Sequence, residues 1–378
     1  MKGFVAVEGR DLKRGLGVVI HSIQKRTHIP ILSCVLLRFD GTRLELRGTD
    51  LEQEIITSVD VTDGSPTPWD MCVDGHVLLS IAKAAGPMNM HIEAAGEKVI
   101  IVLGDHEARY ELSGIRGDDF PTLGKKRGKL VEEFSNGQFV AMLERARPYI
   151  SSEETRYYLN GVCWEHGPNG RRVAATDGHR LYCCRYAGDA IEPFSHIIPR
   201  RTVDTLIHIG QGSDWKIFKL EGGTNITALW FDLGDAVVIS KLIDGTFPQF
   251  DRVIPKPDDQ RHRIKFASAD VVAAINRACA VGSDGRGNNS AVKFHSRSGK
   301  VAIERTRANN DKATALTQSQ WPEAAGKLEP FGFNGLYLSE ILAGCEGEIE
   351  LRIIDEKAPF QIADADETTT RVLMPMRV

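Results

Sequence analysis

The sequence predicts an α+β protein made of three tandem copies of one domain, each with two helices packed on antiparallel sheets. Three observations support this prediction. The same order of segments occurs three times, strand-like alternation is more frequent than helical periodicity, and turn residues separate the strand-like segments. The repeat is roughly 125 residues long, far above the about 20–50 residues of solenoid repeats, so each copy needs a core of its own. We place the domains at residues 1–126, 127–255 and 256–378.

Each copy contains two short amphipathic segments that predict helices, because apolar residues recur three and four positions apart. The first helix of each copy is expected to start near Val7, Ser135 and Ser268, and the second near Asp74, Pro199 and Asn334. Asp74, Ser135 and Ser268 are residue types that favour the N-cap position, so we expect them to cap their helices.

Alternating apolar and polar residues predict half-buried strands in the remaining segments. The clearest are Leu44–Val61, His91–Gly104, His106–Ile115, Arg171–Tyr186 and Glu348–Asp355. Turn pairs such as Asp40-Gly41 and Asn169-Gly170 punctuate them, which indicates hairpins and therefore mainly antiparallel sheets, with about eight strands per copy. Each copy closes on a short segment that contains proline: DDFPTL from Asp118, GTFPQFDRVIP from Gly245, and VLMPMRV at the C-terminal end.

Composition and charge limit the class of protein. Of the 378 residues, 42% are hydrophobic and 26% are charged, and no segment has the roughly 20 apolar residues that span a bilayer. The first residues lack a signal-peptide pattern, so we expect a cytoplasmic protein without membrane contact. Seven cysteines, an odd number without metal-ligand spacing, indicate reduced thiols and no metal or cofactor. A net charge of −4 argues mildly against a simple nucleic-acid-binding surface, but it permits a protein with one basic face.

No sequence motif for a phosphate loop, a dinucleotide fold, a zinc protease or a serine hydrolase is present. The densest cluster of reactive residue types is ATDGHRL at Ala175–Leu181, where Asp177 and His179 could form a general acid–base pair. The same residues also suit a tight turn held by hydrogen bonds from the Asp side chain. No nucleophile lies at useful spacing, which favours the turn, and we assign no catalytic residue.

Two further patterns are compatible with nucleic-acid binding. Arg156-Tyr157-Tyr158 combines a base with aromatic rings that could stack, although a tyrosine pair at a sheet edge explains it equally well. Basic residues flank the predicted helices, namely Lys13, Arg14, Lys25, Arg26, Arg145, Arg147, Arg200 and Arg201. Such residues usually form the solvated face of a helix. Repeated on one face of three copies, they would form a stripe that holds phosphates without reading base sequence.

Ordered motifs over the whole chain carry a resemblance to a known family. They are RTHIPILSCVLL (26–37), GTDLEQEI (48–55), DDFPTL (118–123), RYYLNGV (156–162), ATDGHRL (175–181), IIPRRTVDTL (197–206), LIDGTFPQFDRVIP (242–255), GFN (332–334) and MPMRV (374–378). In this order they resemble the bacterial DNA polymerase III beta subunit, the replicative sliding clamp.

The resemblance implies a non-catalytic processivity factor. Two chains would close head to tail into a ring, two helices of each domain would line the hole, and sheets would form the outside. A basic lining with an acidic exterior would reconcile DNA binding with a net negative charge. The implied partners are double-stranded DNA without sequence preference, a second copy of the chain, the DNA polymerase III catalytic subunit with its 3'-5' exonuclease complex, clamp-loader subunits, and other clamp-binding replication and repair proteins.

The resemblance also implies site residues. A pocket between the second and third domains would bind linear peptides of partner proteins through Leu159, Thr176, Gly178, His179, Arg180, Leu181, Pro248, Arg252, Val253, Asn334, Tyr337, Leu373, Met374, Pro375, Met376 and Arg377. Arg26, Tyr157 and Tyr158 would lie near DNA. The ring interface would join the region of Tyr110 and Leu112 in one chain to the region of Val281 in the next.

Two other hypotheses remain open. The small Ala280 next to Val281 is compatible with a weak ring interface, and the chain would then be a clamp-like protein that binds partner peptides without encircling DNA. An enzyme that uses Asp177 and His179 is the third hypothesis, for which no nucleophile, metal set or cofactor loop gives support.

Overall fold

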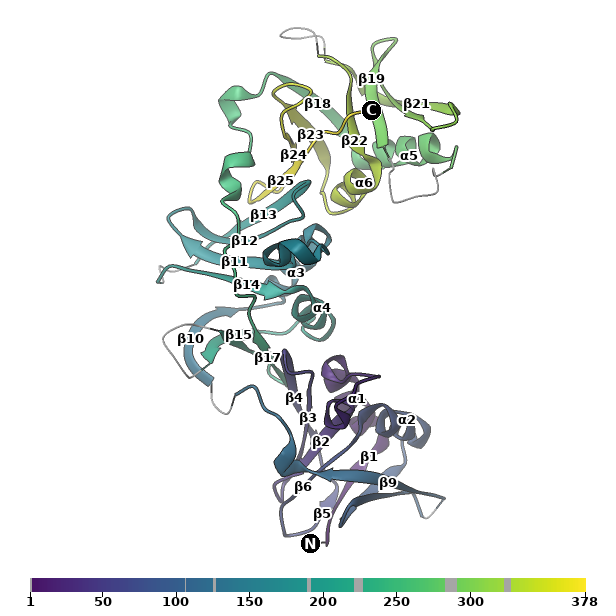
Figure 1. The fold of residues 1–378 in the computed structure, drawn as a ribbon, viewed down its shortest axis with the longest axis vertical. Helices are drawn as coiled ribbons and strands as arrows, with labels where there is room; N and C mark the ends of the chain where they lie inside the picture. The colour runs from purple at the N-terminus through teal and green to yellow at the C-terminus, as the bar shows by residue number, and fades with distance from the viewer. Residues whose placement is uncertain are drawn as a thin grey trace. The chain divides into compact units, whose positions relative to one another are not determined.

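The computed structural model describes residues 2–105, 107–124, 127–188, 192–220, 227–282, 291–322 and 328–378 (Figure 1). The chain forms two compact units. Unit 1 contains Met1–Ala141 and Arg201–Leu242, and unit 2 contains Met142–Arg200 and Ile243–Val378. The segment 283–290, which follows the predicted interface residue Val281 closely in the sequence, lies outside the described residues.

One order of elements occurs three times: strand, helix, four strands, helix, three strands. The first copy contains β1 (Lys2–Glu8), α1 (Gly9–Val19), η1 (Ile20–Ser22), η2 (Pro30–Ser33), β2 (Cys34–Phe39), β3 (Arg43–Thr49), β4 (Gln53–Asp60), β6 (Trp69–Asp74), α2 (Gly75–Ala85), β7 (Asn89–Ala95), β8 (Lys98–Leu103), β9 (Ala108–Arg116) and η3 (Gly117–Asp119). It also has the two-residue strand β5 (Asp63–Gly64).

The second copy contains β10 (Arg127–Phe134), α3 (Gln138–Ala146), η4 (Arg147–Tyr149), η5 (Glu154–Leu159), β11 (Gly161–Gly167), β12 (Gly170–Thr176), β13 (Arg180–Tyr186), β14 (Phe194–Pro199), α4 (Arg200–Ile209), β15 (Trp215–Leu220), β16 (Ala228–Asp232), β17 (Ala236–Lys241) and η6 (Phe250–Val253). The third contains η7 (Pro257–Asp259), β18 (His262–Ala267), α5 (Ser268–Cys279), β19 (Ala291–Arg297), β20 (Lys300–Thr306), β21 (Lys312–Gln320), β22 (Phe331–Asn334), α6 (Gly335–Ala343), β23 (Glu348–Ile353), β24 (Phe360–Ala363) and β25 (Thr369–Leu373). The predicted α+β class and the threefold repetition are confirmed.

Every strand pairing is antiparallel among the described residues, and the sheets run from one copy into the next. In unit 1, thirteen strands follow the order β10-β15-β16-β17-β4-β3-β2-β6-β9-β8-β7-β1-β5. In unit 2, eight strands follow the order β14-β11-β12-β13-β25-β24-β23-β18, and four more form β21-β20-β19-β22. The second copy therefore contributes to both units: β17 joins its sheet to β4 of the first copy, and β13 joins its sheet to β25 of the third.

The helices bury one face against the sheets, as the periodicity predicts. In unit 1, Leu12, Leu16 and Val19 of α1 are fully buried, and α1 and α2 lie together against the sheet (Figure 1). Asp74 caps α2 as predicted, because its Oδ1 accepts a hydrogen bond of 2.8 Å from the amide of Val77. Among the described residues no helix combines the length and apolar character needed to cross a membrane.

Two predicted N-caps are wrong. Ser268 is the first residue of α5 rather than its cap, and its hydroxyl donates to the carbonyl of Leu342 at 3.0 Å. Ser135 lies too early, because Asn136 and Gly137 adopt left-handed φ values of 54° and 68° and α3 begins only at Gln138. A serine in a polar stretch marks the region of a helix start, but local φ/ψ decides which residue is the cap.

Candidate functional site

A cavity of about 230 Å³ lies in unit 2, where η5, the turn between β12 and β13, the η6 region and the end of β25 meet. Its wall combines apolar side chains with two arginines. The lining residues are Arg156, Tyr158, Leu159, Thr176, Gly178, Arg180, Leu181, Pro248, Gln249, Phe250, Val253, Val372 and Met374. A small, mostly apolar cavity with few polar groups is the usual form of a binding pocket for one or two side chains.

Many of the residues predicted for a pocket meet at this cavity: Leu159, Thr176, Gly178, Arg180, Leu181, Pro248, Val253 and Met374. Leu159 and Leu181 are 3% and 2% exposed and belong to one core cluster with Phe247, Phe250 and Val372. The floor of the cavity is therefore part of the core of unit 2 and is held rigidly.

The ATDGHRL segment is the tight turn between β12 and β13. The Oδ1 atom of Asp177 accepts hydrogen bonds from the amides of His179 and Arg180 at 2.9 and 3.0 Å. The hydroxyl of Thr176 donates to the carbonyl of Arg180 at 2.7 Å. Gly178 has a φ of 88°, and a Cβ at this position would collide with the guanidinium of Arg156. Asp177 is occupied by the turn, so its geometry favours a structural role over general acid–base chemistry.

Arg180 forms a buried part of the wall. Its side chain is 7% exposed, pairs with Asp177 at 3.0 Å, and donates to the carbonyl of Pro148 at 2.6 Å. The guanidinium also pairs with Glu340 and lies over the ring of Tyr337, 4.1 Å from its centroid. Groups from α6, η4 and the turn therefore hold this arginine in one position.

His179 and Tyr337 line a neighbouring cavity of about 490 Å³ that shares Arg180. Their ring centroids are 6.3 Å apart. Between the two cavities lies Arg156, which pairs with both carboxylate oxygens of Glu153 at 2.7 and 2.8 Å. His179 and Tyr337 are thus near the pocket, in the adjoining hollow.

The remaining predicted pocket residues are outside both linings, namely Arg252, Asn334, Leu373, Pro375, Met376 and Arg377. Asn334 caps α6 by accepting from the amides of Leu336 and Tyr337. The amide of Met376 donates to the carbonyl of Gly332 at 2.8 Å, which fixes the C-terminal segment. Asn334 and Met376 therefore fix the start of α6 and the C-terminal segment, and the role predicted for all six residues stays a prediction.

Sequence reasoning missed Arg156, Tyr158, Gln249, Phe250 and Val372 as pocket residues. Gln249 and Phe250 lie inside the FPQFDRV motif, so the motif itself was a signal. Val372 lies in β25, and only its pairing with Leu181 of β13 brings it to the wall. Tyr158, predicted to lie near DNA, lines the cavity and is half-buried, whereas Tyr157 is 53% exposed.

The residues predicted for the ring interface and DNA are accessible. Tyr110 and Leu112 lie half-buried on one face of β9 in unit 1, and Arg26 is exposed after η1. Val281 is half-buried directly after α5 in unit 2. Tyr110 and Leu112 project from the same side of one strand, as a shared contact requires.

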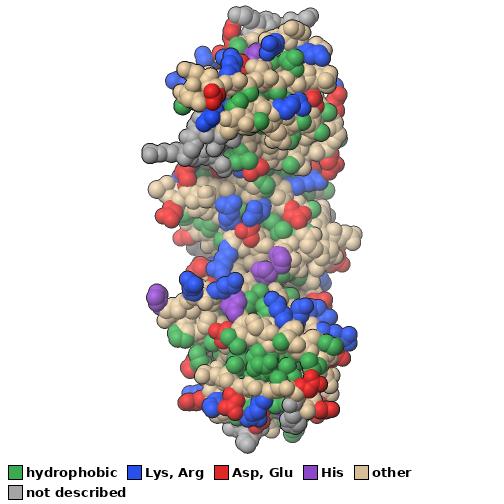
Figure 2. Space-filling view, turned by 90° about the vertical axis from the view of Figure 1, so that its right-hand side faces the viewer, with side chains coloured by type: hydrophobic (Ala, Val, Ile, Leu, Met, Phe, Trp, Pro, Cys, Tyr) green, Lys and Arg blue, Asp and Glu red, His purple; other side chains and the backbone are tan. Residues whose placement is uncertain are grey.

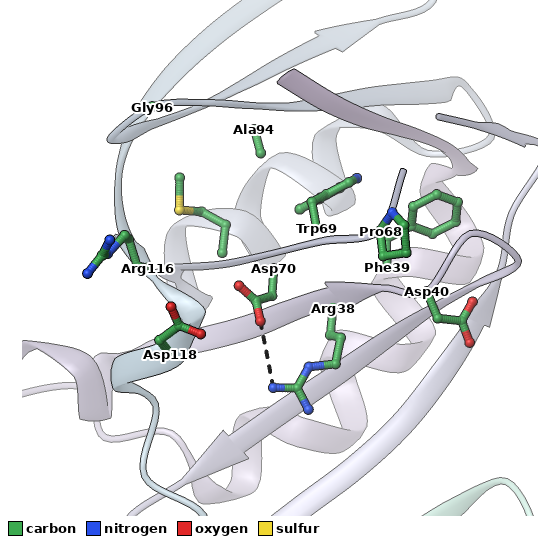
Figure 3. A pocket seen from close by; sticks show the side chains of 11 residues that line it. Arg38, Phe39, Asp40, Pro68, Trp69, Asp70, Ala94, Gly96, Arg116 and Asp118 are labelled. Carbon is green, nitrogen blue, oxygen red and sulfur yellow. Dashed lines mark ion pairs between the residues drawn. The ribbon is translucent and has the colours of Figure 1, made fainter. Parts of the chain in front are cut away.

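Another cavity, of about 640 Å³, lies in unit 1 and contains none of the predicted pocket residues (Figure 3). Trp69, Met71 and Ala94 form its apolar floor. Charged side chains of both signs surround it, and Arg38 and Asp70 approach to 3.8 Å across it (Figure 3). The mixed charges do not select one kind of ligand.

Metal and thiol chemistry receive no support from the part of the chain that the structure describes. It contains no group of three His, Cys, Asp or Glu side chains that could hold a metal ion. All seven cysteines are free, and burial raises the pKa of Cys72 and of Cys183 to about 12. Burial raises the pKa of Cys163 further, so these thiols stay protonated and unreactive near neutral pH.

Comparison with known proteins identifies the family. The family model described as the N-terminal domain of the DNA polymerase III beta subunit matches residues 4–124. The model for the central domain of the same subunit matches residues 134–249. The chain belongs to the DNA polymerase III beta subunit family, the beta sliding clamps. Members of this family are non-catalytic processivity factors of DNA polymerase III, so the enzyme hypothesis for Asp177 and His179 is abandoned.

Relatives match over the whole length. The beta sliding clamp of Pseudomonas aeruginosa is 28% identical, covering 98% of this chain and 99% of the relative. That of Caulobacter vibrioides is 29% identical over 99% of this chain and 100% of the relative. A crystal structure of the Pseudomonas aeruginosa sliding clamp bound to griselimycin has a TM-score of 0.89 at 25% identity and covers 100% of both chains. The Bartonella birtlesii clamp bound to griselimycin has a TM-score of 0.87 at 27% identity and also covers 100% of both chains.

Proposed function

We propose that two copies of this sliding clamp close head to tail into a ring around duplex DNA, and that the ring tethers the replicative polymerase. In this proposal the three domains are residues 1–126, 127–255 and 256–378, and the protein acts in the cytoplasm. Partner proteins, including the polymerase catalytic subunit and the clamp loader, dock linear peptides in the unit 2 pocket. The main support for the proposal is the way in which strands of successive copies pair and so join their sheets.

Both internal junctions are built in the same way. At the first, β17, the last strand of the second copy, pairs with β4 of the first copy. At the second, β25, the last strand of the third copy, pairs with β13, which occupies the same place in the second copy. The corresponding strands left over are β9, the last strand of the first copy, and β21 of the third. The same pairing therefore joins β9 of one chain to β21 of another.

Each of these strands has a free edge. β21 is the terminal strand of its four-stranded sheet. β9 pairs with β6 only from Gly114 to Arg116, so the edge of Ala108–Ser113 opposite β8 has no strand partner among the described residues. On β21, Leu316 is 46% exposed. Exposed edges and apolar side chains of this kind are normally covered in a native assembly.

The junctions also set the register of the new pair. At the first junction, Val237 lies opposite Ile56. Val237 of β17 pairs with the last residue of the preceding strand, β16. The residue of β9 that pairs in the same way with the last residue of its preceding strand, β8, is Ala108. On the partner strand, Ile56 lies two residues after the residue of β4 that pairs with the last residue of β3. In β21, the residue two positions after the one that pairs with the last residue of β20 is Thr314. We infer that Ala108 of one chain faces Thr314 of the other, which places Tyr110 opposite Lys312.

The pocket suits short apolar peptide motifs. Leu159, Leu181 and Met374 present an adaptable apolar surface, and a volume of about 230 Å³ limits the guest to one or two large side chains. Arg156 can contact peptide carbonyls at the rim, where its side chain is 33% exposed. For DNA, we propose contacts from Arg26 and Tyr157, with Tyr158 supporting Tyr157 from the pocket side, since the two rings pack edge to face at 5.9 Å.

Light scattering over a dilution series tests ring formation first. We expect a stable mass of twice 41.7 kDa and retention on circular DNA that is lost when the DNA is linearised. A monomer at every concentration that still binds partner peptides would refute the ring and support the clamp-like peptide binder.

Cysteine cross-linking tests the register. The pair A108C and T314C should give a covalent dimer on oxidation, because directly opposed residues of antiparallel strands lie about 4.5–5.5 Å apart at Cα, within disulfide reach. A108C with Gln318→Cys is the matched control, since four residues shift the partner by roughly 13 Å along the strand. Equal cross-linking of both pairs would contradict the inferred register.

A further inference from the structure

A pair of histidines in unit 1 lies at the first junction, outside the peptide pocket. His21 in η1 and His208 in the last turn of α4 have ring centroids 4.4 Å apart, tilted by 53°. His21 is half-buried and His208 is exposed, so the pair opens to solvent. The surface shown in Figure 2 carries histidines together with lysine and arginine side chains.

The positions of the two histidines have equivalents at the second junction, where other residues occupy them. Arg180 donates to the carbonyl of Pro148, and Gln53, at the equivalent place in its turn, donates to the carbonyl of His21 at 3.0 Å. His21 therefore corresponds to Pro148. Counting from the first residues of α4 and α6, His208 corresponds to Ala343. At the second junction Pro148 and Ala343 border the cavity of about 490 Å³, and at the first junction two imidazoles take these places.

The backbone beneath the pair is fixed. The carbonyl of His21 accepts from Gln53 Nε2 and, at 3.5 Å, from Arg201. Arg201 pairs with Asp50 at 2.7 Å, and the side chain of Asp50 is 1% exposed. Asp50 also accepts from the amides of Glu52 and Gln53. The charge of this carboxylate is therefore already matched and does not serve the imidazoles.

Three neighbouring elements carry charged groups. They are Arg201 and Asp204 on α4, Asp50 and Glu52 in the turn between β3 and β4, and Lys241 on β17, which pairs with Glu52. His21 lies in η1, directly after α1, and His208 lies in the last turn of α4. Burial and the neighbouring His208 oppose protonation and lower the pKa of His21. A bound anion would counteract this effect, because it supplies a countercharge to both rings.

We propose that His21 and His208 bind one backbone phosphate of duplex DNA between them and take up protons as they do so. This inference rests on the proposed passage of DNA through the ring. At a centroid distance of 4.4 Å, two imidazolium N–H groups can donate to oxygens of the same phosphodiester, and charge-assisted bonds of this type are stronger than neutral ones.

Proton uptake gives the site a pH dependence with a defined sign. If binding raises the pKa of the pair, affinity for DNA increases as pH falls, by at most about tenfold per pH unit for each proton taken up. A transition-metal site made of the same two rings would need neutral imidazoles and would show the opposite sign. No third ligand joins the pair among the residues that the structure describes.

The experiment measures binding of the full-length protein to a short mixed-sequence duplex by fluorescence anisotropy at low salt, from pH 8 to pH 6. We expect the unmodified protein to bind roughly tenfold more tightly at pH 6 than at pH 8, as an average uptake of about half a proton over these two pH units requires. The double variant H21Q/H208Q should bind within about twofold of the unmodified protein at pH 8 and lose most of the increase, by the same linkage. H91Q is the control, because His91 is exposed on β7 and stacks on Phe4 at 4.8 Å.

Imidazole NMR titration with and without the duplex provides the direct readout. The pKa values of both histidines should rise when DNA binds, and the single variant H208Q, at an exposed position, should abolish the rise at His21 without unfolding the protein. An equal pH response in the double variant, or unchanged histidine pKa values, would overturn the inference while leaving the ring intact. Absence of duplex binding and of retention on circular DNA at every pH would instead overturn the proposed function along with it.

Discussion

The two arginines that line the proposed peptide pocket should differ sharply in their contribution to stability. Arg180 is 7% exposed and binds Asp177, Glu340 and the carbonyl of Pro148. Arg156 is 33% exposed, pairs with the exposed Glu153 and donates to the carbonyl of Asp177. Replacing Arg180 by methionine keeps the apolar stem but leaves a buried carboxylate and a carbonyl without their partner.

The size of the effect follows from exposure. Removing one partner of a buried ion pair costs about 3–5 kcal/mol, and the Asp177 side chain is 12% exposed. Glu340 is 41% exposed and can turn to water, so we expect a value near the lower end, about 3 kcal/mol. R156M should leave the free energy of unfolding nearly unchanged, since ion pairs at this exposure contribute little.

Urea unfolding of both variants at one protein concentration measures the difference, because dimer formation makes stability depend on concentration. Peptide binding is measured in parallel, and we expect both variants to weaken it, because both side chains line the cavity. If R180M loses less than about 1 kcal/mol of unfolding free energy, or if R156M loses as much as R180M, burial does not determine how much these ion pairs stabilise the protein.

Three further predictions follow from the same geometry. Y158A should weaken peptide binding severalfold and Y157A should leave it unchanged while reducing retention on DNA, since only Tyr158 lines the cavity; reversed effects would contradict the assignment. G178A should cost roughly 1–2 kcal/mol in urea unfolding, because φ is 88° and the new Cβ displaces Arg156; an unchanged midpoint would show that the turn relaxes. Burial raises the pKa of Asp366, but hydrogen bonds from Thr368 and Thr369 outweigh it and lower the pKa overall. The contribution of Asp366 to stability is therefore complete above the pKa it has in the unfolded chain and is lost as pH falls through its pKa in the folded protein. The urea unfolding midpoint should drop between pH 5 and pH 3, and this drop should be smaller in D366N.

Local patterns in the sequence predicted the elements well, because alternation and helical periodicity report burial without knowledge of the partner. The segment Leu44–Val61 shows the limit. It is two strands, β3 and β4, separated by a turn in which Leu51 adopts a left-handed φ of 75°. A leucine gives no turn signal, so only the Thr-Asp that precedes it marked the reversal.

The pocket could be predicted only in part, since its wall joins segments far apart in the chain. The turn was predictable from Thr176, Asp177 and Gly178, whose types suit an Asx-stabilised reversal. The contribution of Val372 depends on the pairing of β25 with β13, which is a property of the junction between copies. Such nonlocal pairing leaves no periodic signal, and the family resemblance was needed to propose that the two strands meet.

The two junctions within the chain share the backbone framework of one turn. The turns 49–54 and 176–181 share the same hydrogen bonds: Thr49 and Thr176 donate to the carbonyl four residues on, at 2.9 and 2.7 Å, and Asp50 and Asp177 each accept from two amides.

They differ in the side chains that the turns present. The first turn places Leu51, itself 36% exposed, where the second has Gly178, and Gln53 where the second has Arg180. With glycine at this position, the guanidinium of Arg156 can lie directly over the backbone and form one wall of the pocket. The backbone framework of this turn is thus common to the first and second copies. The side chains that the framework holds differ between the junctions: they form the cavity wall in one case and a histidine pair in the other.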